Sequence, residues 1–171
     1  MSKKNLIIII SSVAAGLILL GALGVWLAHI FKSGNGSAGK GGTPVISVGS
    51  VTASPGKTVK IPVNFKNNPG AMGFFIEFEY DANVLEYLST DKGELLTDCT
   101  AAEAGSGKLK LVSVEDGDVK KDGTLAYLNF KIKDGASGKA EIKAVCGENS
   151  ICNYDEKAIS VKTENGTVTV N

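Results

Sequence analysis

The residues of this chain that could do acid–base chemistry are few and lie far apart. Glu77 and Glu79 are two positions apart, so on a strand they would share one face, as paired carboxylates of a hydrolase must. The single histidine, His29, lies at the end of a long apolar segment and suits a membrane boundary better than a general base. We therefore interpret Glu77 and Glu79 as a charged rim, and we do not expect an enzyme.

Oxygen and sulfur ligands are equally sparse. Asp116, Asp118 and Asp122 crowd one stretch but lack the bidentate glutamate of an EF-hand, so we predict no metal site. Cys146 and Cys152 flank a short GENSI segment and could form a disulfide, which the sequence leaves undecided because it gives no distance. The third cysteine is expected to be a small buried hydrophobe.

The first 32 residues predict a membrane anchor. Lys3 and Lys4 precede an uncharged stretch from Asn5 to Ala28, close to the roughly 20 apolar residues that a spanning helix needs. We interpret residues 1–32 as an uncleaved signal anchor, with secretion after signal cleavage as the alternative. The N-terminal lysines favour the inside, which would place the rest of the chain, in single-pass topology, outside the cell.

Two further segments follow this anchor. Residues 33–43 read as a Gly/Ser-rich linker, in which a G-x-G-x-x-G match has no strand before it and so carries no nucleotide site. Residues 44–171 are of single-domain size. They contain 14 lysines, no arginine and 18 acidic residues, a formal charge of 14 − 18 = −4 that disfavours nucleic-acid binding.

Alternating apolar residues predict that the outer domain is all strand. The run from Met72 to Tyr80 places Phe74, Ile76 and Phe78 on one side and leaves Phe75 among carboxylates on the other. Turn signals every eight to twelve residues favour a β-sandwich. The expected strands are Val45–Val51, Thr58–Lys66, Met72–Tyr80, Val84–Ser89, Thr97–Ala101, Lys108–Val114, Thr124–Lys133, Ala140–Cys146 and Ile159–Val170.

Several motifs in this domain resemble the cohesin domains of cellulosome scaffoldins. They are F-x-Y-D-x-N-V-L-E from Phe78, G-x-V-x-x-x-x-G-x-x-V-x-I-P-V-x-F from Gly49, V-x-V-E-D-G from Val112, K-D-G-x-L-A-x-L-x-F-x-I from Lys121, and V-x-T-x-N-G-x-V-x-V from Val161. The resemblance implies an all-β fold, a nine-stranded jelly-roll-like β-sandwich, behind the N-terminal transmembrane helix.

The resemblance also implies a function and a site. Cohesins bind dockerins on the face of their eighth, third, sixth and fifth strands, so a dockerin-bearing enzyme or scaffold would be held at the cell surface and support polysaccharide degradation. Calcium would belong to the dockerin, and no cofactor is expected here. Gly73 and Phe75 stand where family members offer Asn and Asp, which predicts a more hydrophobic version of the interaction. The implied contact residues are Gly73, Phe75, Glu77, Thr100, Lys110, Val112, Val114, Glu115 and Lys143.

Two alternatives remain at this point. A carbohydrate-binding module that binds polysaccharide directly would share the sandwich, but such modules use rows of exposed aromatic rings. The outer domain has no tryptophan, and Tyr87, Tyr127 and Tyr154 fall on different predicted elements. A plain adhesive domain, with Phe75 in homotypic contacts, is the other alternative.

Overall fold

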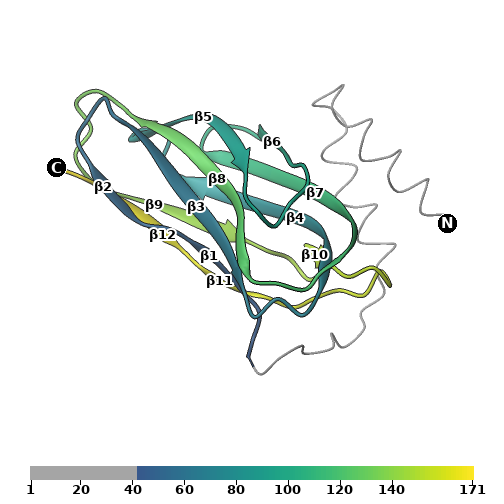
Figure 1. Cartoon of the computed structure of the whole chain (residues 1–171). Coiled ribbons are helices and arrows are strands. Elements are labelled where there is room, and N and C mark those ends of the chain that lie inside the picture. Colours follow the sequence, from purple (N-terminus) through teal and green to yellow (C-terminus); the bar gives the residue numbers. More distant parts are fainter. Residues whose placement is uncertain (1–41) are drawn as a thin grey trace.

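The structure, a computed structural model, describes residues 42–171, and these form two packed β-sheets (Figure 1). The first sheet has the strand order β11-β1-β3-β8-β5, and the second has the order β2-β12-β9-β4-β7-β6 with β10 also paired to β4. The strands of the first sheet are β1 (Val45–Val48), β3 (Thr58–Lys66), β5 (Leu85–Lys92), β8 (Gly123–Ile132) and β11 (Lys162–Glu164). Those of the second are β2 (Val51–Ala53), β4 (Ala71–Tyr80), β6 (Thr100–Glu103), β7 (Lys108–Val119), β9 (Gly138–Val145), β10 (Ile151–Cys152) and β12 (Gly166–Val170).

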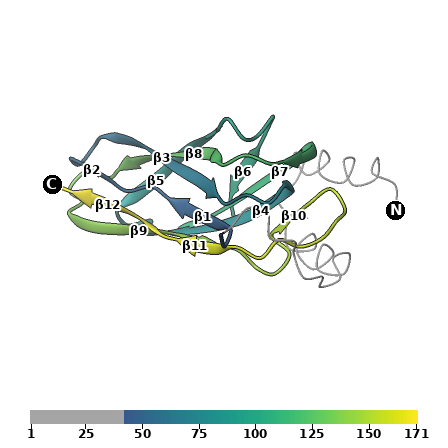
Figure 2. The same cartoon turned by 60° about the horizontal axis from the view of Figure 1, so that its bottom comes forward.

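The core lies between the two sheets, as the period-two patterns predict. Alternate residues of β3 and β4 are buried, and Phe65 and Phe78 are 0% exposed. Aromatic rings join the layers: Tyr80 of β4 lies 4.9 Å from Phe130 of β8, centroid to centroid. In Figure 2 the layer with β3 and β8 lies above the layer with β9 and β12. The predicted all-β sandwich is thus confirmed for the described residues.

The described residues contain twelve strands where the sequence predicts nine, because two predicted strands split and one was missed. The stretch predicted as Val45–Val51 changes sheet at Gly49, giving β1 and β2. The last predicted strand splits in the same way around Asn165, giving β11 and β12. A Cβ on Gly166 would collide with the Gly49 carbonyl oxygen, and a Cβ on Gly49 would collide with the Pro62 ring, so the chain has no room for a side chain at either crossing. The missed strand, β10, has only two residues.

Residues 42–171 include no helix that is long and apolar enough to cross a membrane. The predicted anchor at residues 1–32 and almost all of the predicted linker at 33–43 lie outside the described residues.

Candidate protein-binding face

Four neighbouring strands of the second sheet, β9, β4, β7 and β6, form one outer surface, which we call the β4 face. Their register determines which side chains meet on it. Phe75 of β4 pairs with Val112 of β7, and Val112 pairs in turn with Thr100 of β6. In the next row, Glu77 pairs with Lys110 on one side and with Val145 of β9 on the other. The structure therefore brings strands far apart in the sequence into one continuous surface.

Phe75 lies near the middle of the β4 face and is half-buried, so part of its surface is open to solvent. It has the phase opposite to the buried Phe74 and Ile76, so its ring faces outward. The Nζ of Lys110 lies 5.6 Å from the centroid of this ring, within cation–π range. Val112 and Val114, also half-buried, extend the apolar centre along β7.

A rim of paired charges surrounds this apolar centre. Lys110 Nζ lies 3.0 Å from Glu77 Oε1, and Lys108 Nζ lies 3.3 Å from Glu79 Oε1. Lys143 of β9 extends the rim, with its Nζ 3.5 Å from an oxygen of Glu141. Each of these three carboxylates has its own lysine, so the three pairs together carry no net charge. Such exposed pairs contribute about 0–1 kcal/mol each to stability.

These pairs also decide how Glu77 and Glu79 are to be interpreted. Both carboxylates are matched with lysines of β7 rather than directed at each other across a site. The predicted rim is therefore what the structure shows. Asp118 and Asp122 also have structural roles: Asp118 Oδ1 accepts the Tyr154 N–H at 2.6 Å, and Asp122 Oδ1 accepts the Asn68 N–H at 2.9 Å. Within residues 42–171, no group of acidic, cysteine or histidine side chains could hold a metal ion.

Glu115 does not join the predicted contact residues on the β4 face. Its phase on β7 is that of Leu111 and Ser113, and it is only 5% exposed. Its carboxylate accepts the backbone N–H of Thr97 at 2.9 Å and lies 2.9 Å from the Ser113 hydroxyl oxygen. The alternation after Val112 indicates this inward direction, since Glu115 is an odd number of residues away.

Gly73 lies on the β4 face, but a cysteine covers it. Gly73 pairs with Cys152 of β10, and a Cβ built on Gly73 would lie 2.7 Å from the Cys152 Sγ. Directly opposed residues share one side of a sheet, so the thiol fills the place of a side chain at position 73. No sequence pattern indicates this contact, because β10 has only two residues and lies in a predicted loop.

The structure adds one apolar residue that the sequence prediction missed. Val145, at the end of β9, is 43% exposed and pairs with Glu77, so it extends the apolar centre of the β4 face. Ile142 and Ala144 are buried, and a period-two count along this strand places Val145 on the opposite, outer side.

All three cysteines are free thiols, so the disulfide between Cys146 and Cys152 that the sequence left undecided is not formed in this structure. Burial raises the thiol pKa values of Cys146 and Cys152 to about 11. Burial also raises the thiol pKa of Cys99, which is half-buried beside the core. Reactive thiols need a lowered pKa, which none of these three cysteines has.

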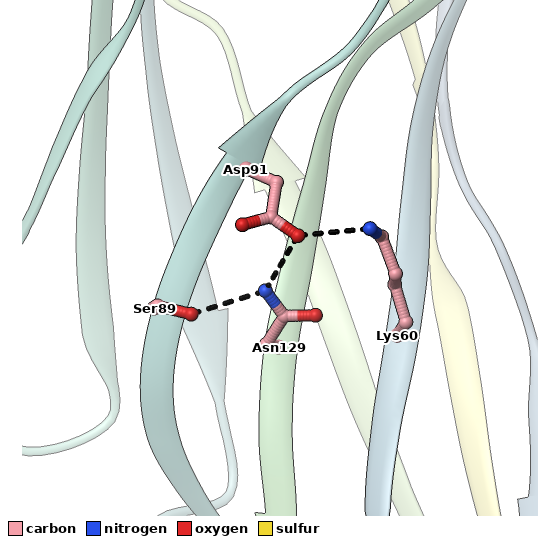
Figure 3. A network of polar contacts seen from close by, with 4 residues as sticks. All are labelled: Lys60, Ser89, Asp91 and Asn129. Atoms are coloured by element: carbon pink, nitrogen blue, oxygen red, sulfur yellow. Dashed lines mark hydrogen bonds and ion pairs between the residues drawn. The ribbon is translucent and has the colours of Figure 1, made fainter.

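The outer surface of the other sheet differs from the β4 face in chemistry. Lys60 of β3 donates to Asp91 of β5 at 2.8 Å, and Asn129 of β8 donates to both Asp91 and Ser89 (Figure 3). The Lys60 ammonium also lies 4.4 Å above the Tyr127 ring. The polar groups drawn in Figure 3 contact one another, so this part of the other sheet has a polar outer surface.

Comparisons with known proteins agree with this geometry. A family model described as "Cohesin domain" matches residues 44–170. The chain is 30% identical over 135 residues to Cellulose-binding protein A of Clostridium cellulovorans, covering 75% of this chain and 7% of that protein. It is 34% identical over 115 residues to Cellulosomal-scaffolding protein A of Acetivibrio thermocellus, covering 58% of this chain and 6% of that protein. The chain thus spans a small part of these relatives.

Solved structures resemble the described fold. The sixth cohesin of scaffoldin B from Acetivibrio cellulolyticus, solved in complex with a dockerin, matches with a TM-score of 0.70 at 27% identity, covering 76% of this chain and 100% of that one. A cohesin from Clostridium thermocellum, also solved with a dockerin, matches with a TM-score of 0.67 at 25% identity, covering 79% of this chain and 96% of that one.

Proposed function

The chain belongs to the cohesin domain family, and from this premise we propose that its β4 face binds a dockerin carried by another protein. Cohesin domains are non-catalytic protein–protein interaction modules, so this domain is not an enzyme. The two solved relatives described above were captured with dockerins, which supports a dockerin as the class of partner.

The observation that carries this proposal is the outward, half-buried ring of Phe75 near the middle of the β4 face. Val112, Val114 and the exposed Val145 continue the apolar surface around it. A fixed sheet loses little conformational entropy on binding, so little of the free energy gained by burying these side chains is offset. A central apolar patch with a polar rim is the usual anatomy of a protein interface.

The same residues support a largely hydrophobic mode of docking. The apolar Phe75, Val112 and Val145 dominate the centre, and the nearest polar groups, Glu77 and Lys110, already satisfy each other at 3.0 Å. A partner hydroxyl placed here would compete with that ion pair, whereas an apolar partner side chain would not. We therefore expect the partner to present aliphatic or aromatic residues to Phe75.

Direct polysaccharide binding is a weaker candidate, because the tyrosines do not form a platform. The Tyr127 ring lies under the Lys60 ammonium. Tyr87 packs edge-on against Phe130 with centroids 5.9 Å apart, and its hydroxyl contacts Thr90. Tyr154 lies in the segment after β10, beside Asp118.

The proposal extends to the place of this domain in the cell. The apolar residues 5–28 support an anchor, from which the domain would hold a dockerin-bearing enzyme or scaffold near the outer surface of a cell that degrades polysaccharide. Labelling of intact cells with an antibody against residues 44–171 would test this display. Labelling only after permeabilisation would contradict it.

The docking proposal is tested by calorimetric titration of the domain with a panel of calcium-loaded dockerins. We expect at least one to bind at micromolar concentration or better, with binding lost in chelator because calcium belongs to the dockerin. Phe75→Ala should weaken binding by about 2 kcal/mol, roughly thirtyfold, if the ring is an interface anchor. The control is Asp91→Ala, which removes a carboxylate from the other sheet (Figure 3) and should leave the affinity unchanged. Failure of the whole panel would refute the proposal.

A further inference from the structure

We propose that Glu115, a buried carboxylate of β7, positions β6 for partner binding and does so without touching the partner. This inference rests on the proposed docking function. It assigns a role to a residue that its sequence motif placed on the contact surface but that is 5% exposed in the structure.

The segment from Gly93 to Cys99 carries the chain from one sheet to the other. Its first part is fixed to the first sheet, where Gly93 and Leu95 donate their backbone N–H groups to Leu125 and Thr124 of β8 at 2.7 and 3.1 Å. Leu95 and Leu96 then enter the core, at 3% and 4% exposure. This half of the segment is held by backbone bonds and burial together.

The second half is held to β7 by two side chains. Glu115 Oε2 accepts the backbone N–H of Thr97 at 2.9 Å, and the Ser113 hydroxyl donates to the backbone carbonyl of Asp98 at 2.7 Å. Strand β6 begins at Thr100, only two residues beyond Asp98. These contacts therefore determine where the chain enters β6.

Strand β6 depends on such support because it is short and lies at the end of its sheet. It has four residues and pairs with β7 alone in the strand order of this sheet. Thr100 pairs with Val112, which pairs with Phe75, so a displaced β6 would move one border of the apolar centre. The affinity of the β4 face should therefore depend on Glu115.

Counting hydrogens defines the test. The Ser113 hydroxyl has one hydrogen but faces two acceptors, the Asp98 carbonyl at 2.7 Å and Glu115 Oε1 at 2.9 Å. A glutamine at position 115 could accept from Thr97 with its oxygen and donate to Ser113 with its amide, freeing the hydroxyl for Asp98. Glu115→Gln should thus preserve the arrangement, whereas Glu115→Ala should abolish it.

Two measurements on these variants test the inference. In the free domain, Glu115→Ala should raise hydrogen exchange of residues 100–103 at least tenfold while exchange of β4 and β9 stays unchanged. Its affinity for a dockerin bound by the wild type should fall at least tenfold. Glu115→Gln should match the wild type within twofold in both. The matched control is Glu94→Ala. Like Glu115, Glu94 accepts a backbone N–H with its carboxylate, but its partner is Thr124 of the other sheet, at 2.7 Å. This control should leave the affinity within twofold.

Each other result has a defined meaning. If Glu115→Ala speeds hydrogen exchange throughout the domain, the positioning role is overturned. It is also overturned if exchange rises only at residues 100–103 while the affinity for the dockerin stays unchanged. If the wild type binds no dockerin, the proposed function fails, and exchange confined to β6 would still support Glu115 as the residue that fixes this strand. Should Glu115→Ala not fold, Ser113→Ala removes the bond to Asp98 and the contact with Glu115 Oε1 but keeps the bond from Thr97 to Glu115, and should produce a smaller change in the same direction.

Discussion

Replacing Gly73 by alanine should destabilise the domain, and removing the Cys152 sulfur should relieve that effect. A Cβ at position 73 would lie 2.7 Å from Cys152 Sγ, about 1 Å inside the contact distance of roughly 3.5–4.0 Å between nonbonded heavy atoms. Cys152 is 6% exposed, so its sulfur has little free space to move into. Either the thiol changes rotamer into its packed surroundings or β10 moves away from β4.

The expected cost follows from this overlap. Overpacking of this kind typically costs about 1–3 kcal/mol. We expect about 2 kcal/mol for Gly73→Ala, which for a domain of this size lowers the melting temperature by roughly 6 °C. In Cys152→Ala the clashing sulfur is gone, so adding Gly73→Ala to that variant should cost about 0.5 kcal/mol or less. The coupling between the two positions is then about 1.5 kcal/mol in the relieving direction.

The assay is urea unfolding of the wild type, both single variants and the double variant. Cys99→Ala serves as the matched control, because it also removes a thiol, but not the one that a Cβ on Gly73 would meet, which is that of Cys152. Gly73→Ala should be additive with Cys99→Ala. Additivity with Cys152→Ala as well would refute the reasoning, since it would mean that the thiol does not occupy the side-chain position of residue 73.

Three further predictions concern pH and salt. Burial raises the thiol pKa values of Cys146 and Cys152 from 9.0 to about 11, so the protonated thiols stabilise the folded domain below pH 9 and this stabilisation should be lost between pH 9 and 11. The urea midpoint should therefore fall over this pH range, and it should fall less in a variant with both thiols replaced by alanine. The hydrogen bond from Lys60 lowers the pKa of Asp91 below its ordinary 3.8. The ionised Asp91 therefore stabilises the folded domain above pH 3.8, and this stabilisation is lost as the pH falls through the lowered pKa. Asp91→Asn should make the urea midpoint of unfolding depend less on acid pH. Because the three carboxylates of the rim are paired with lysines, affinity for a bound dockerin should change less than about threefold between 0.05 and 0.5 M salt, and a steep loss would show that unpaired charges dominate.

Most of the fold is predictable from alternation, because each long strand buries one side. Strand β3 matches its predicted range, Thr58–Lys66, and the inward residues of β4 are those that the pattern gives. The errors occur where a strand is short or changes sheet. Gly49 lets one run of residues serve both sheets, and two-residue β10 carries too little pattern to be found.

The outward phase of several candidate contact residues is predictable from alternation, but Glu115 points inward and the binding role of the others stays a prediction. Alternation gives Phe75, Lys110 and Val112 the outward phase of their own strands, the resemblance to cohesins implies that these strands are neighbours, and the structure brings the three residues together. Alternation cannot show that Glu115 has buried partners, because the N–H of Thr97 comes from a segment far away in the sequence. The burial of Gly73 under Cys152 depends in the same way on a contact across 79 positions of chain.

One comparison of two matched substitutions tests the docking surface most directly. Val145 and Leu88 are both exposed aliphatic residues, at 43% and 47%, but Val145 lies on the β4 face and Leu88 on β5 of the other sheet. Titration with a dockerin that the wild type binds should show at least tenfold weaker binding for Val145→Asp and less than a twofold change for Leu88→Asp. Equal binding by Val145→Asp and the wild type, or loss of binding in Leu88→Asp alone, would contradict the assignment of the β4 face as the surface that receives the partner.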